Sequence, residues 1–184
     1  MPKQTPSQTI GPFFHHDMFL EDANIMVNDQ TRGQRITIVG QVFDGEGEPV
    51  TDAMVELWQA DAQGYFNHPQ DPNQAQADRH FRGFGRAETV NNGRFVFQTI
   101  KPGCIPGQAT PYINVRIFAR GMLIHAVTRL YFDDEAGNAD DPVLNSIDPA
   151  RRRTLIAQEQ SDSGLTYCYD IHLQGEQETV FFDP

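Results

Sequence analysis

Apolar and polar residues alternate along several short stretches of this chain, a pattern typical of half-buried β-strands. In residues 53–60 (AMVELWQA), Val55 and Leu57 share one face while Glu56 and Trp58 share the other. Similar alternation, or enrichment in β-branched and aromatic residues, predicts further strands over residues 35–43, 94–99, 112–119, 122–132 and 165–173. Turn-forming residues follow or precede these runs, as in DGEGEP at 44–49 and Asn92-Gly93.

A helix is predicted in only one place, the stretch DPARRRTLIA at 148–157. Asp148 can act as its N-cap, Pro149 suits the first turn, and Leu155 with Ile156 gives a short apolar face. Many short strands without alternating helices favour an all-β fold over a parallel α/β sheet. We therefore expect an antiparallel β-sandwich with an extended N-terminal arm and one short helix.

Residues 1–34 lack the period of a helix or strand, so we interpret them as an N-terminal arm preceding one β-sandwich domain over residues 35–184. The arm contains Ile10, Phe13 and Phe14, which makes it too apolar for a solvated tail. It is expected to pack on a partner chain, although the body of the same chain is an equal alternative. Residues 60–86 also lack a period, and long connections of this kind are commonly functional.

The charge of the chain narrows the classes of partner. Its 184 residues carry a formal net charge of -11, which disfavours binding to nucleic acid and to anionic membranes. A small anionic ligand would need locally focused positive charge, so individual arginines become candidates. Cys104 and Cys168 are expected to be free, buried thiols, and the absence of a signal-like apolar run predicts a cytoplasmic protein.

Three segments of the sequence resemble the intradiol ring-cleaving dioxygenase family: QTIGPFF at 8–14, VELWQADAQGYF at 55–66 and FARGMLIHAVTRLYFDDE at 118–135. TIKPG at 99–103 and the ending GEQETVFFDP extend the resemblance over nearly the whole chain. The family's members are β-sandwiches, which agrees with the pattern of strands. The resemblance is specifically to the alpha-type chains, which pair with a homologous beta subunit.

In the beta-type chains the resemblance implies a ferric iron held by two tyrosines and two histidines. The matching positions in this chain are Phe66, Ile105, Tyr112 and Asn114. Phe and Ile have no donor atom, and a lone tyrosine with a neutral amide makes a poor transition-metal site. We therefore expect no catalytic residue and no metal in this chain, with Fe(3+) in the partner beta subunit.

The remaining histidines give no obvious replacement for a metal site. His15 and His16 are adjacent and would point to opposite sides of an extended arm. The others lack chelating spacing, so surface or hydrogen-bonded histidines are favoured; they are His68, His80, His125 and His172.

For the alpha-type chains, the resemblance implies an arm and an arginine that complete the substrate pocket of the beta subunit. The corresponding residues are Thr9, Gly11, Pro12, Phe13 and Arg120, with Phe13 standing where some relatives have Tyr. The implied ligands are dioxygen and protocatechuate, a dihydroxybenzoate whose negative charge suits a guanidinium. Other readings are a salt bridge at the rim for Arg120 and a rigid bend for Gly11-Pro12.

Two more arginines, Arg86 and Arg129, are candidates for pocket or interface charge, whereas Trp58, the only tryptophan, is expected in the core. Two other classes of function stay open at this point. One is a stand-alone β-sandwich binding module, against which the apolar arm argues. The other is a homo-oligomeric hydrolase, for which the sequence offers no nucleophile elbow or metal-binding helix motif.

Overall fold

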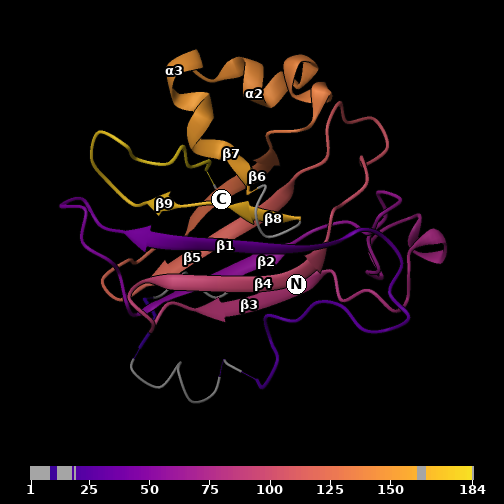
Figure 1. The fold of residues 1–184 in the computed structure, drawn as a ribbon, viewed down its shortest axis with the longest axis horizontal. Helices are drawn as coiled ribbons and strands as arrows, with labels where there is room; N and C mark the ends of the chain where they lie inside the picture. The colour runs from indigo at the N-terminus through magenta and orange to yellow at the C-terminus, as the bar shows by residue number, and fades with distance from the viewer. Residues whose placement is uncertain (1–8, 12–17, 19, 161–164, 184) are drawn as a thin grey trace, which may run out of the picture.

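The computed structural model describes residues 9–11, 18, 20–160 and 165–183. Within them, nine strands form one sheet: eight follow the order β3-β2-β5-β6-β7-β8-β1-β4, and the ninth, β9, pairs with β1 (Figure 1). The strands are β1 (Arg35–Phe43), β2 (Ala53–Trp58), β3 (Phe84–Glu88), β4 (Arg94–Ile100), β5 (Ile113–Ala119), β6 (Ala126–Phe132), β7 (Ile156–Gln160), β8 (Thr166–Cys168) and β9 (Ile171–His172).

The expected all-β class is confirmed, but the sheet is mixed rather than antiparallel. β1 runs parallel to β8 and β9, and β6 runs parallel to β7, while the other neighbouring strands are antiparallel. A parallel neighbour needs a long crossover connection instead of a tight turn. The helical segment between β6 and β7 provides that crossover, and alternation within single strands could not reveal it.

The core lies between the two ends of the sheet, which face each other. Ile38 of β1 and Phe97 of β4 belong to the same buried cluster as Val55 of β2 and Val115 of β5, and all four are 0% exposed. Figure 1 shows β1 and β4 side by side, with β2 and β5 behind them. Burying one such side chain is worth about 1.5–3 kcal/mol relative to leaving it in water. The β1–β4 pair and the β2–β5 pair are therefore held against each other mainly by the burial of apolar side chains.

The predicted turn at Asn92-Gly93 is present between β3 and β4. Both residues have positive φ, 53° and 75°, which fits a tight turn with an Asn-Gly sequence. In β1, Gly40 has another role, because a Cβ atom there would lie 1.9 Å from the carbonyl oxygen of Tyr169. This close approach lets Tyr169 N donate to Val39 O at 2.8 Å, just after β8.

The described residues contain two α-helices where one was expected. α3 (Pro149–Arg152) begins as predicted, with Asp148 accepting a hydrogen bond from Ala150 N. It is shorter than expected, because η3 (Arg153–Leu155) follows and Ile156 already belongs to β7. α2 (Pro142–Ser146) was missed, although it begins with the same Asp-Pro pair. The remaining 3-10 helices are η1 (Gln74–Gln76) and η2 (Ala136–Asp140).

Figure 1 places α2 and α3 together at one edge of the sheet. Leu144 of α2 and Leu155 of η3 are buried beside Tyr112 and Tyr131 in a second, smaller core cluster. Among the described residues, no helix combines the length and the apolar composition needed to cross a membrane.

Three strand predictions differ in extent from the structure. The predicted strand over 122–132 begins only at Ala126, because Gly121, with φ of 88°, lies in the turn after β5. The run over 165–173 divides into β8 and β9. β3 was missed, since its sequence FGRAE lies at the end of the irregular connection over 60–86.

The described part of the N-terminal arm packs on the body of its own chain near residue 26. Met26 is 0% exposed and belongs to the main core. Met26 N donates to Gln98 O of β4 at 2.8 Å, and Arg82 N donates to Met26 O at 3.0 Å. The division at residue 34 and the packing of the arm on a partner chain stay predictions.

Candidate functional site

The candidate site lies on the outer face of β3, β2, β5 and β6, the side turned away from the main core. Alternation along β5 buries Val115 and Ile117 and leaves Asn114 and Arg116 on the outer side. The pairing of the strands brings Asn114 beside Trp58 of β2 and Arg129 of β6. The outer face therefore collects polar and aromatic side chains from four strands, and two of the four positions matched to iron ligands lie on it.

Trp58 lies at the centre of this region and is only partly buried, so the prediction that it lies in the core is wrong. The ring of Phe66 stacks on it with centroids 5.7 Å apart, and the ring of His68 meets it edge-on at 5.6 Å. Asn114 Nδ2 makes a long hydrogen bond of 3.5 Å to Trp58 O. Phe66, His68 and Ile105 line one cavity of about 410 Å³ together with Trp58. The structure thus gathers three of the four matched positions around this tryptophan.

The fourth position, Tyr112, is covered by an arginine. Arg129 Cζ lies 4.1 Å from the centroid of the Tyr112 ring, a cation–π contact. Arg129 Nη1 also donates to the Tyr131 hydroxyl at 3.3 Å, and that hydroxyl donates to Asp141 Oδ1 at 3.3 Å. Burial raises the pKa of Tyr131 to about 12, so its hydroxyl keeps its proton at neutral pH.

The side chains at these four positions do not fit an iron ion. Phe66 and Ile105 offer no donor atom, and Asn114 offers only a neutral amide. The guanidinium of Arg129 beside Tyr112 would repel a metal cation bound there. Over the described ranges, no cluster of three or more His, Cys, Asp or Glu residues could hold a metal ion.

The structure brings two of the predicted substrate-binding residues close together. Gly121 N donates to Thr9 Oγ1 at 3.1 Å, so Thr9 of the arm lies beside the turn that follows Arg120. Arg120 Nε is 3.0 Å from Asp52 Oδ2, and the Arg120 side chain is 84% exposed. Gly11 is exposed, whereas Pro12 and Phe13 lie outside the described residues.

The turn that carries Arg120 is followed by two exposed apolar side chains. Leu123 is 70% exposed and Ile124 is 61% exposed. His125 behind them stacks on Phe118 of β5, with ring centroids 4.9 Å apart. An exposed cation next to exposed apolar residues is the composition of a contact surface.

Arg86, the other arginine singled out from the sequence, is engaged within the chain. Its Nε donates to Glu56 Oε1 at 2.9 Å, and its Nη1 donates to Met18 O at 2.9 Å. Glu56 is only 8% exposed, so this ion pair is partly desolvated, and Arg86 links β2, β3 and residue 18 of the arm. Arg86 is therefore a structural ion-pairing residue.

Two buried aspartates that the sequence reasoning did not single out organise the long connection. Asp61 Oδ1 accepts from Tyr65 N at 3.0 Å, and Asp61 Oδ2 accepts from Asp78 N at 2.7 Å. Asp78 Oδ2 in turn accepts from Arg32 N at 2.8 Å. Although burial alone would raise the pKa of Asp78, the backbone N–H groups of Arg32 and His80 hold it below its ordinary value. This network fixes the segment that carries Phe66.

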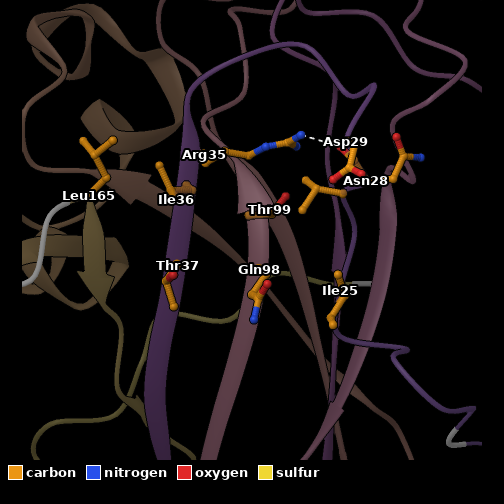
Figure 2. A pocket seen from close by; sticks show the side chains of 10 residues that line it. Ile25, Asn28, Asp29, Arg35, Ile36, Thr37, Gln98, Thr99 and Leu165 are labelled. Carbon is orange, nitrogen blue, oxygen red and sulfur yellow. Dashed lines mark hydrogen bonds between the residues drawn. The ribbon is translucent and has the colours of Figure 1, made fainter.

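A further cavity of about 530 Å³ lies between the arm, the start of β1 and the end of β4. Figure 2 shows the Arg35 side chain reaching toward the segment that carries Asn28 and Asp29. Arg35 Nη2 donates to the carbonyl oxygens of Asn28 and Thr31. Because these bonds use its cation within the chain, we interpret this cavity as the place where the arm is tied to the body.

Comparison with known proteins agrees with this arrangement. A family model described as dioxygenase matches residues 9–175. The chain is 43% identical to the protocatechuate 3,4-dioxygenase alpha chain of Burkholderia cepacia, over 98% of each chain. It is 45% identical to the alpha chain of Pseudomonas putida, over 98% of this chain and 96% of that one. The chain belongs to the intradiol dioxygenase family.

Other members of this dioxygenase family are more distant. The protocatechuate 3,4-dioxygenase beta chain of Burkholderia cepacia is 34% identical, over 94% of this chain and 77% of that one. Among solved structures, the dioxygenase domain from Streptomyces sp. SirexAA-E is similar with a TM-score of 0.66 and 28% identity, covering 94% of this chain and 99% of that one. The fold and the sequence therefore indicate the same family.

Proposed function

We propose that this chain is the alpha subunit of a protocatechuate 3,4-dioxygenase. In this role it completes the substrate pocket of an iron-bearing beta subunit that cleaves 3,4-dihydroxybenzoate with O2 to 3-carboxy-cis,cis-muconate. The observation that carries the proposal is the 43–45% identity, over 98% of this chain, to two alpha chains of that enzyme. The donor-poor residues at the four matched positions support assigning the iron to the partner.

Arg120 is the residue of this chain that we assign to the substrate. Its side chain is 84% exposed, and its only ion pair within the described residues uses Nε, with Asp52. The two terminal nitrogens can therefore form a bidentate contact with a carboxylate or with anionic oxygens of a ring. A guanidinium in such a place also stabilises negative charge that develops during the reaction, without transferring a proton.

Thr9 and Gly11 support the same proposal from the arm. The hydrogen bond from Gly121 N to Thr9 Oγ1 ties the arm to the turn that carries Arg120, so both elements would meet a partner together. Pro12 and Phe13 follow in the sequence and are proposed to line the same pocket. Leu123 and Ile124 would be covered by the partner chain, which accounts for their exposure in the isolated chain.

Co-expression with a homologous beta chain tests this function. Oxygen uptake with protocatechuate is measured for this chain alone, for the beta chain alone and for the purified mixture. The proposal expects a hetero-oligomer by size-exclusion chromatography and full activity only when both chains are present. A chain that never associates with the beta chain, or a beta chain with the same catalytic efficiency alone, would overturn it.

A further inference from the structure

The pairing of four strands creates two adjacent rows of side chains on the outer face. One row crosses the sheet as Arg86, Glu56, Arg116 and Val127, and the next as Phe84, Trp58, Asn114 and Arg129. Residues directly opposite each other in antiparallel strands project to the same side. The first row is thus mainly charged, and the second mainly aromatic and amide.

A cavity of about 400 Å³ lies between these rows. All but one of its lining residues come from the two rows: Glu56, Trp58, Phe84, Asn114, Arg116 and Val127. This volume falls within the range of about 300–1,000 Å³ that is usual for small-molecule pockets. Aromatic side chains with a few polar groups are also the usual lining of such pockets.

The charged groups of the cavity differ in whether they have partners. Glu56 is neutralised by Arg86, whose Nε and Nη2 both donate to Glu56 Oε1. Arg116 is exposed, and among the described residues no hydrogen bond or ion pair joins its guanidinium to another group. In a chain with a net charge of -11, a guanidinium in a cavity without an acidic partner is a local excess of positive charge.

We propose that this cavity is a binding site of this chain for a small aromatic carboxylate. The carboxylate is bound by the guanidinium of Arg116, with the amide of Asn114 as a second donor. The ring lies against Trp58 and Phe84, where aromatic rings pack favourably at offset or edge-on angles. An aliphatic anion would lack the ring contacts, and a neutral ring would lack the ion pair.

Trp58 provides a direct readout because it is the only tryptophan of the chain. The purified full chain, without any partner, is titrated with benzoate while the tryptophan fluorescence is followed. We expect a saturable change in the millimolar range or below, together with a shift of the Trp58 indole N–H signal in the NMR spectrum. Acetate, which has no ring, and benzyl alcohol, which has no charge, are expected to bind far more weakly.

Arg116→Gln removes the cation and keeps a side chain of similar polarity. It is expected to weaken benzoate binding by about tenfold to a hundredfold, the usual effect of losing a hydrogen bond to a charged group. Arg116→Lys is expected to retain part of the affinity, because a point charge lacks the planar fork. Arg94→Gln, at an exposed arginine of β4 on the other side of the core, serves as the matched control and leaves binding unchanged.

Two results would overturn the site. The first is the absence of any saturable response of Trp58 to benzoate. The second is equal binding by the wild-type chain and a folded Arg116→Gln variant. Because the titration uses this chain alone, its outcome is independent of whether the chain assembles with a beta subunit or takes part in ring cleavage.

Discussion

The two faces of β5 have opposite characters within one strand of seven residues. Ile113, Val115 and Ile117 face the main core and are all 0% exposed. Asn114 and Arg116 face outward, where the aromatic and charged residues of the neighbouring strands surround them. The inner face is selected by shape and apolar burial, whereas the outer face is free to change its chemistry. A fold can therefore persist while the donor atoms of a metal site are replaced.

The outer face also shows what can occupy a site without a metal. A guanidinium, that of Arg129, lies over Tyr112, and the rings of Trp58 and Phe66 stack on each other. At these positions the chain has aromatic rings and a guanidinium instead of the donor atoms that a metal site would need.

The largest expected effect is on the inner face. Ile117→Ala removes buried apolar atoms from a closely packed core and should lower the free energy of unfolding by about 2–5 kcal/mol. Arg116→Ala, at the next residue of the same strand, should change it by no more than about 0.5 kcal/mol, since surface changes have small effects. Urea denaturation of both variants measures the difference. Equal destabilisation by the two changes would remove the distinction between the faces.

The second effect concerns Arg120 in the assembled enzyme. Arg120→Ala should lower catalytic efficiency on protocatechuate by about tenfold to a hundredfold, because a hydrogen bond to a charged group contributes about 1.5–3 kcal/mol. Iron content should not change, and Arg120→Lys should restore only part of the activity. Steady-state kinetics with the beta chain present measures the effect.

Asp52→Asn is the matched control for Arg120. It removes the ion-pair partner of Arg120 and leaves the guanidinium in place, and an exposed pair of this kind adds little to stability. We expect the catalytic efficiency to stay within a factor of about two of the wild type, because the guanidinium of Arg120 is still present. If Asp52→Asn and Arg120→Ala reduce efficiency equally, or if neither does, Arg120 is a structural ion-pair residue and does not act on the substrate.

The third and smallest effect tests the polar network of Asp61 and Asp78, which fixes the segment that carries Phe66. Asp78→Asn takes away one of two acceptors for backbone N–H groups and should cost about 1–2 kcal/mol of stability at neutral pH. The pKa of Asp78 lies below its ordinary value of 3.8 in the folded chain. Its contribution is therefore complete above pH 3.8 and is lost as the pH falls through the lower folded value.

Thermal unfolding of the Asp78 variant at several pH values measures this contribution. The difference between wild type and Asp78→Asn should be constant near neutral pH and shrink in strong acid. Asp140→Asn, at an exposed carboxyl group in η2, serves as the control and should have no such effect. A difference that persists unchanged in acid would mean that the Asp78 charge is not what stabilises the loop.

Much of the fold could be predicted from the sequence because the strands obey a simple period. β1 was predicted with its observed bounds, since its alternation is bracketed by turn residues. β3 was missed because FGRAE has neither alternation nor β-branched residues, and its place depends on pairing with β2. The parallel pairings were missed because they depend on contacts between distant segments.

The candidate site was predictable in part and for a different reason. The matched positions came from resemblance, and the structure groups Phe66, Ile105 and Asn114 around Trp58. The place of Arg129 over Tyr112 could not be read from the sequence, because it follows from the pairing of β5 with β6. The sequence likewise could not show that Arg86 is paired with Glu56 while the guanidinium of Arg116 has no partner among the described residues, because this depends on which side chains meet in space.

The amount of iron bound by this chain tests the central claim most directly. The purified full chain and its complex with a beta chain are compared by metal analysis and visible absorption. We predict no stoichiometric iron in this chain alone and iron in the complex in proportion to its beta subunit. A tyrosinate-to-iron charge-transfer band, with one iron per isolated chain, would contradict it.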